Sequence, residues 1–280
     1  MLISNSTSNI TAFSGIDEQK TELFLRPFGW LAEDLEIDFH QMCHPELEMQ
    51  ILECCISNRQ GTKLDRTFFW NLEIGKRTEY LLTLATLSNS SQINVNLRCS
   101  NLDCQKQMEI TIPLLEIIRL QQQSENQTTE IAIASEKFSL RKPTGNDQRL
   151  WLKQHFLDEG SAILAMVQSL LVAEERSTFQ QVSSQEQYWI DTLNQVMEEI
   201  DPIVNFNLQA NCPYCGSENL QDFDLGAWAL QQLYGVQQQL IVTIHRLAWH
   251  YHWSESEIFA IPPARRLRYL TLINREENYR

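Results

Sequence analysis

Two cysteine pairs, far apart in the chain, constrain its fold more than any other feature of the sequence. The second pair lies in the segment NCPYCG, where two residues separate Cys212 from Cys215. Pro213 stiffens this turn, and Gly216 permits the positive φ that lets backbone N–H groups point at sulfur. Such a turn holds two thiolates close together and supplies half of a tetrahedral metal site.

The first pair, Cys99 and Cys104, is separated by four residues and lacks the proline and glycine of the second. It lies between residues 93–97 (INVNL) and 108–112 (MEITI), which alternate apolar and polar side chains. A period of two is typical of strands that are buried on one face. The segments around the second pair alternate less regularly, with Leu220 expected on the apolar face. Both pairs are therefore predicted to lie at the tips of β-hairpins.

Two hairpin tips with two cysteines each can supply all four ligands of a zinc ion. Zinc prefers tetrahedral coordination, and sites closed by four thiolates are structural rather than catalytic. The sequence therefore predicts one structural Zn²⁺ bound by Cys99, Cys104, Cys212 and Cys215. The first turn is the looser half of this site, because it is wider than a tight knuckle.

Two other interpretations of the cysteines stay open at the level of sequence. The four thiols could be reduced and free of metal. Alternatively, Cys212 and Cys215 could form a redox-active dithiol. Such a motif usually lies at the start of a helix, where the thiol pKa is lowered. Here the polar segment GSENLQDFD follows instead. A catalytic zinc would also need an open coordination position, which four thiolates do not leave.

Composition and charge predict a soluble, cytoplasmic, acidic protein. The chain has 280 residues, is 43% hydrophobic and carries a formal net charge of −14. That charge disfavours binding to nucleic acid or to anionic lipid, since both need clustered Lys and Arg. The apolar runs are too short to span a bilayer, and the N-terminus does not resemble a secretory signal. Seven cysteines in such a chain favour reduced thiols or a metal over disulfides.

The periodicity predicts an α+β fold, mainly helical, with short antiparallel β-hairpins. Two of these hairpins would be cysteine-tipped and joined as a split site resembling a zinc ribbon. We expect four segments along the chain. They are a flexible N-terminal arm (1–22), a helical region with the first cysteine hairpin (23–120), a linker with a short hairpin (121–146), and a helical region with the second cysteine hairpin and C-terminal helices (147–280).

Several individual elements can be predicted from spacing and capping residues. The segment PELEMQILECCI places four apolar residues on one helical face: Leu47, Ile51, Leu52 and Cys55. The short hairpin after the polar stretch 121–130 should turn at residues 135–137. Thr144 or Asn146 should cap a helix, and Ser254 with Glu257 fits a capping box. Further helices are expected at about 78–87, 147–157, 160–174, 185–200, 226–252 and 263–274.

No other part of the sequence forms a recognisable active site. His245, His250 and His252 are spaced by five and two residues, so they do not share a helical face. No glycine-rich phosphate loop and no nucleophile with a partnered histidine occur. The basic segment RRLRYL, residues 265–270, could face an acidic partner or form a solvated helix face that complements a C-terminal dipole. We therefore expect a protein that is not an enzyme.

The C-terminal third resembles a family encoded by contractile phage tails and contractile injection systems. The matching elements are, in order, the Cys-Pro-x-Cys-Gly knuckle, a helix with Trp228 near its start, IHRLAWHYHWSESEI and ARRLRYL. Upstream, FSLRKPTGNDQ resembles the family's short hairpin that leads into a helix. Members are described as baseplate or baseplate-hub assembly proteins of T-even-phage type.

This resemblance implies a structural role in a phage-tail-like particle. The chain would help to join hub or spike, tube and sheath, in multiple copies, through contacts with other baseplate, hub or tube subunits. An alternative within the same resemblance is a chaperone of hub assembly that leaves the mature particle. An acidic chain can pair with basic faces of neighbouring subunits, which steers association.

Overall fold

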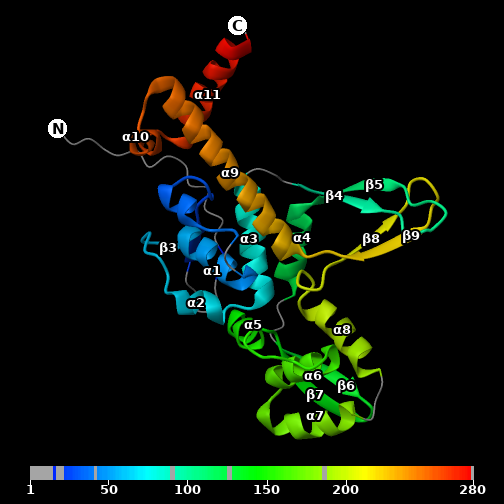
Figure 1. The fold of residues 1–280 in the computed structure, drawn as a ribbon. Coiled ribbons are helices and arrows are strands. Elements are labelled where there is room, and N and C mark those ends of the chain that lie inside the picture. The colour runs from blue at the N-terminus through cyan, green and yellow to red at the C-terminus, as the bar shows by residue number, and fades with distance from the viewer. Residues whose placement is uncertain are drawn as a thin grey trace. The chain divides into compact units, whose positions relative to one another are not determined.

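Figure 1 shows a computed structural model of the chain, in which helices are combined with short antiparallel sheets. This arrangement agrees with the expected mainly helical α+β fold with antiparallel hairpins. The structure describes residues 15–16, 22–40, 43–88, 92–124, 128–184 and 188–278. Most of the predicted flexible arm, residues 1–22, lies outside the described residues.

Helices contribute most of the regular structure. The α-helices are α1 (His44–Cys55), α2 (Arg66–Asn71), α3 (Ile74–Ser88), α4 (Leu114–Gln123), α5 (Gly145–Trp151), α6 (Glu159–Leu170), α7 (Arg176–Ser183), α8 (Trp189–Ile200), α9 (Leu225–Tyr251), α10 (Glu255–Ala260) and α11 (Pro263–Asn278). Short 3₁₀ helices are η1 (Ala32–Glu36) and η2 (Ala173–Glu175). No helix in the described part of the chain has the length and apolar character needed to cross a bilayer.

Every sheet in the described residues is small and antiparallel. The strands are β1 (Gly15–Ile16), β2 (Glu22–Leu25), β3 (Ile56–Asn58), β4 (Gln92–Arg98), β5 (Gln107–Pro113), β6 (Thr128–Ile133), β7 (Glu136–Arg141), β8 (Asn207–Asn211) and β9 (Glu218–Asp222). β1, β2 and β3 form one sheet, and the other strands form the hairpins β4–β5, β6–β7 and β8–β9.

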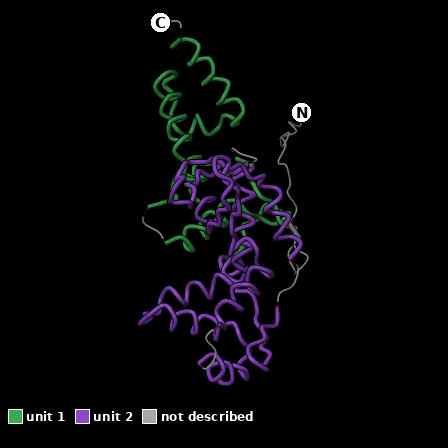
Figure 2. The backbone as a smooth tube through the Cα atoms, turned by 90° about the vertical axis from the view of Figure 1, so that its right-hand side faces the viewer, with its two compact units in different colours: residues 1–65, 87–89, 230–280 green, residues 66–86, 90–229 purple. Residues whose placement is uncertain are grey.

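The chain divides into two compact units, each of which draws on separate stretches of sequence (Figure 2). Unit 1 contains residues 1–65, 87–89 and 230–280, and unit 2 contains residues 66–86 and 90–229. Both units are discontinuous, because α3 and α9 each contribute residues to both. The four-segment division expected from the sequence stays a prediction.

In unit 1, α1 buries the face that its sequence predicts. Leu47, Ile51, Leu52 and Cys55 are each at most 2% exposed, and a proline lies in the first turn. Further along the chain, α9, α10 and α11 enclose a separate apolar cluster formed by Leu240, Ile244, Leu247, Ile258, Leu270 and Ile273. The capping box of α10 is present as predicted, since Ser254 and Glu257 exchange hydrogen bonds between their side chains and backbone N–H groups.

In unit 2, the β6–β7 hairpin packs with α6, α7 and α8 around aromatic residues. The rings of Phe138 and Phe179 lie 5.2 Å apart, and those of Phe179 and Trp189 lie 5.5 Å apart, both edge to face. This geometry is favourable because the positive ring edge meets the negative face of its neighbour. Thr144 is the N-cap of α5, which confirms one of the two expected caps.

The structure corrects three local predictions in unit 2. The polar stretch 121–130, expected to precede the short hairpin as a linker, is partly regular, because α4 continues to Gln123 and β6 begins at Thr128. The turn of the β6–β7 hairpin lies one residue earlier than expected, where Ala134 adopts a φ of 55°. The helix expected to run to residue 174 ends at Leu170, because Leu171 is extended and forms a β-bridge with Leu140.

Candidate metal centre

The four predicted cysteine ligands meet in unit 2. Their sulfur atoms all lie within 4.8 Å of one another. The Sγ atoms of Cys99 and Cys215 are 3.6 Å apart, and those of Cys104 and Cys212 are 3.8 Å apart. Sulfurs bound at about 2.3 Å to one tetrahedral zinc lie about 3.8 Å from one another. The residues present therefore fit a four-thiolate metal centre.

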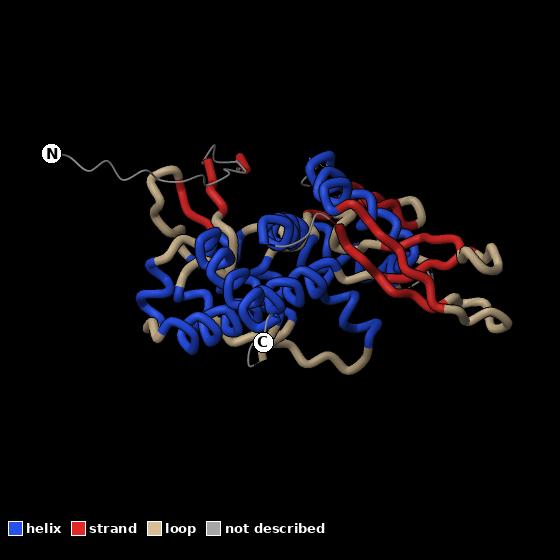
Figure 3. The backbone as a smooth tube through the Cα atoms, turned by 90° about the horizontal axis from the view of Figure 1, so that it is seen from above, coloured by secondary structure: helices blue, strands red, loops and turns tan. Residues whose placement is uncertain are grey.

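The cysteines meet because β4–β5 and β8–β9 lie side by side and carry their tips at the same end (Figures 1 and 3). The first hairpin has the predicted alternation, with Ile93 opposite Ile112 and Leu97 opposite Met108. Its inward side chains Ile93 and Leu97 are at most 3% exposed. Both predicted cysteine-tipped hairpins are present.

The two tips close in a similar way despite their different spacing. The Cys99 N–H donates to the Lys106 carbonyl at 3.0 Å, and the Cys212 N–H donates to the Ser217 carbonyl at 2.9 Å. Gly216 has the predicted positive φ, 73°, and its N–H donates to the Cys212 carbonyl. The wider first turn uses a positive φ as well, since its φ at Gln105 is 45°. A looser spacing thus still brings its two sulfurs to the cluster.

Asn219 ties the two hairpins together beside the cysteines. Its Oδ1 accepts hydrogen bonds from the Ser100 backbone N–H at 2.6 Å and from the Ser100 hydroxyl at 2.9 Å. Its side-chain amide donates to the Ser217 carbonyl at 2.9 Å, and the residue is only 4% exposed. The sequence reasoning missed Asn219 and placed Leu220 on the apolar face, which is wrong because Leu220 is 69% exposed. The buried position of β9 is polar because it meets backbone groups of the first hairpin.

The pKa values of two thiols of this cluster, Cys99 and Cys215, are shifted in opposite directions. Burial raises the pKa of Cys99 to about 12. Hydrogen bonding to Ser217 lowers the pKa of Cys215 to about 6. Close thiols cannot all ionise without a cation, so a metal that binds here must displace protons and its affinity must fall at low pH.

One comparison with known proteins identifies the family. Residues 35–226 match the model of the family described as T4 bacteriophage base plate protein. The chain belongs to this family. The match covers most of the chain and contains both cysteine pairs, whereas the C-terminal motifs that follow residue 226 lie outside it. No curated protein and no solved structure matches significantly.

In this baseplate-family chain, a buried polar joint links the segment that follows the first cysteine hairpin to the segment that precedes the second. α4 follows the first hairpin and α8 precedes the second. Gln121 of α4 donates from Nε2 to Asp201 at 2.8 Å, and the Ser124 hydroxyl donates to the Ile200 carbonyl. Asp201 is fully buried, and burial raises its pKa. The two cysteine hairpins are thus connected at their tips, and the helices α4 and α8 that adjoin them in sequence are connected by this joint.

The residues around this polar joint are tightly packed. A Cβ added to Gly75, in the first turn of α3, would overlap the Asp201 carboxylate. Lys142, only 4% exposed, donates from Nζ to the Ser124 carbonyl at 2.9 Å. None of these residues has a signal in the sequence, since a buried polar contact between distant segments depends on the fold.

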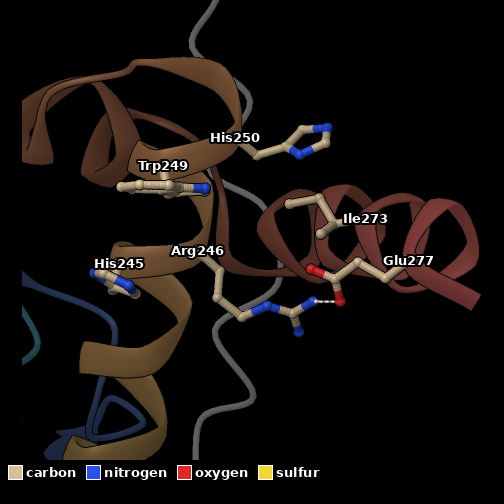
Figure 4. A pocket seen from close by; sticks show the side chains of 6 residues that line it. All are labelled: His245, Arg246, Trp249, His250, Ile273 and Glu277. Carbon is tan, nitrogen blue, oxygen red and sulfur yellow. Dashed lines mark hydrogen bonds and ion pairs between the residues drawn. The ribbon is translucent and has the colours of Figure 1, made fainter. Parts of the chain in front are cut away.

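His245, His250 and His252 lie in unit 1. His245 and His250 line a cleft of about 270 Å³ with Arg246, Trp249, Ile273 and Glu277 (Figure 4). In this cleft the Arg246 guanidinium donates to Glu277 at 2.7 Å, as the dashed line marks. His252 follows the end of α9 with a φ of 56°. Among the described residues, only the four cysteines form a cluster of three or more such side chains that could hold a metal.

Proposed function

We propose that the chain is a structural component of the baseplate of a contractile injection system or phage-tail-like particle, and that it is retained in the mature particle. There it would help to join hub or spike, tube and sheath. Its partners would be other baseplate, hub or tube subunits, it would be present in several copies, and assembly would take place in the cytoplasm. The family match, which spans both cysteine hairpins, carries this proposal.

The proposed metal is one structural Zn²⁺ ion, with Cys99, Cys104, Cys212 and Cys215 as its ligands. The proposal is supported by the fit of their sulfur separations to the edge of a zinc tetrahedron. Bound zinc would join two segments that are distant in sequence and so stabilise unit 2. Four thiolates would fill the coordination sphere and leave no position for a reacting water. We therefore propose a scaffold without enzymatic activity.

Quantitative mass spectrometry of purified, assembled particles tests the proposed role. The expected result is this chain at a constant ratio to the sheath-, tube- and spike-type subunits across preparations. A chain that is present in lysates and in assembly intermediates but missing from finished particles would contradict retention. That outcome would favour an assembly chaperone instead.

A further inference from the structure

The outward face of α11 in unit 1 is basic, although the chain as a whole is acidic. The helix packs inward through its buried residues Arg266, Leu270 and Ile273. On its opposite side, at helical spacings of three and four, lie four exposed residues: Arg265, Arg268, Leu272 and Arg275. We refer to these four as the basic face.

The first arginine of the basic face, Arg265, works against the stability of the helix, whereas Arg275 lies in the last turn, where a cation is favourable. α11 begins at Pro263, so Arg265 and Arg268 lie in its first two turns, and its first turn has no acidic residue. The N-terminus of a helix carries partial positive charge, and cations placed there are unfavourable. The expectation that RRLRYL complements a C-terminal dipole is therefore wrong, because the segment lies at the other end of its helix.

One arginine of the segment has a clear internal role. Arg266 donates from Nη2 to the Trp30 carbonyl at 3.1 Å, and its guanidinium lies 5.2 Å from the centre of the Phe259 ring. The three arginines of the basic face differ from Arg266 in their contacts. Within the described ranges of the chain, no carboxylate forms an ion pair with Arg265, Arg268 or Arg275, whereas Arg246 of α9 pairs with Glu277 at 2.7 Å.

We propose that the basic face of α11 docks on an acidic segment of a neighbouring protein subunit. Exposed guanidinium groups are well suited to pairing with carboxylates in two-pronged geometry. Leu272, 47% exposed, lies among the arginines and offers an apolar contact at the centre of the face. A net charge of −14 opposes close approach to a nucleic acid, which favours protein as the partner. Only the assignment of the neighbour to the baseplate rests on the proposed function.

Photo-crosslinking from the centre of the basic face tests this proposal. Leu272 is replaced by p-benzoylphenylalanine in the 280-residue chain, in cells that assemble the particle, and crosslinked peptides are sequenced. The expected product joins Leu272 to a protein segment with an excess of Asp and Glu. In the double variant Arg265→Glu/Arg268→Glu, the crosslink yield should fall about tenfold, because two attractive charges become repulsive. Changing two acidic residues of the captured segment to Lys should restore it.

Two controls separate loss of docking from loss of folding. Arg119→Glu changes an exposed arginine on α4, in unit 2, and should leave the crosslink yield unchanged. The double variant itself should melt at the same temperature as the parent chain or slightly higher, since Glu is favourable at the start of a helix. A double variant that melts lower and crosslinks less would show only that the arginines support the fold, and would overturn the proposal.

Three other outcomes would also overturn the proposal: no crosslink, a crosslink to a neutral or basic segment, or a crosslink to nucleic acid. The proposed function fails separately, through absence of the chain from purified particles. If the chain is found in particles but forms no crosslink to an acidic segment, the baseplate role stands and the proposed docking face fails. If the chain crosslinks to an acidic protein but leaves before the particle matures, the docking face stands and the proposed baseplate role fails.

Discussion

At the scale of single residues, Cys212 illustrates how a short motif can indicate a site. The residue is 2% exposed, and Gly216 adopts the positive φ that the motif requires. Thr144 and Ser254 likewise cap the helices that their sequences predict. Asn219 could not be predicted, because its partner Ser100 belongs to a hairpin that is distant in sequence.

Replacing Cys212 by Ser should remove the metal and destabilise unit 2. A serine hydroxyl is a poor zinc ligand, and structural zinc contributes directly to the free energy of folding. Metal content and melting temperature of the purified variant give the readout. Cys43→Ser, at an exposed cysteine outside the cluster, is the matched control. Its zinc content should stay unchanged and its melting temperature should not fall, because serine is a favourable N-cap for α1. Unchanged zinc content in the Cys212 variant would show that Cys212 is not a zinc ligand.

Asp147 should make stability depend on pH. Burial alone would raise its pKa, but hydrogen bonds from Arg141 and Thr144 outweigh burial and hold the pKa below the ordinary value of 3.8. The carboxylate therefore stabilises the fold above pH 3.8, and this contribution disappears as the pH falls through the lowered pKa. Asp147→Asn should cost about 2 kcal/mol at pH 7 and progressively less in acid.

Denaturant unfolding of the Asp147→Asn variant at a series of pH values checks this. Asp222→Asn, at an exposed position of β9 that makes no ion pair in the described part of the chain, should show little effect at any pH. A constant difference between the Asp147 variant and the parent chain down to pH 2 would contradict the assignment.

At the scale of elements, periodicity predicted the first hairpin and the long helix well. The pairing of β4 with β5 and the extent of α9 follow from apolar spacing within one segment. The second hairpin was harder, because β9 buries the polar Asn219 and exposes Leu220, the residue that the pattern places on the buried face. The end of α6 also escaped prediction, since a bridge from Leu171 to another segment stops the helix.

Two glycines in helices should respond oppositely to replacement by alanine. Gly75→Ala would push a methyl group into the Asp201 carboxylate and should destabilise the chain by about 3 kcal/mol, as overpacking does. Gly235→Ala, in α9, meets no atom within 4 Å and should stabilise the chain by about 0.5–1 kcal/mol. Urea unfolding measures both. A destabilised Gly235 variant, or a Gly75 variant as stable as the parent, would contradict the packing described.

At the scale of the whole molecule, the discontinuous units were beyond sequence reasoning. Unit 1 combines residues up to position 65 with residues from position 230 onward, a pairing that no local pattern encodes. The meeting of the two cysteine pairs was predictable for a chemical reason, since a tetrahedral metal needs four ligands. Family membership was likewise predictable from motifs, although the matched segment ends at residue 226.

Removal of the metal should loosen only part of the molecule. A chelator should increase amide hydrogen exchange in β4–β5 and β8–β9, because the contacts at their tips are lost. Exchange in α9 from Leu240 onward, in α10 and in α11 should stay unchanged, since the apolar cluster of those segments contains none of the four cysteines. Hydrogen exchange with mass spectrometry resolves these segments. Uniform loosening of the whole chain, or no change at the hairpins, would count against a local metal clamp.

The proposed scaffold depends on four thiolates from two distant hairpins sharing one structural zinc ion. X-ray absorption at the zinc edge of the purified chain tests it most directly. One zinc per chain is expected, with a single shell of four sulfur atoms at about 2.3 Å. A chain without bound zinc, or a zinc shell that contains nitrogen or oxygen neighbours, would contradict it.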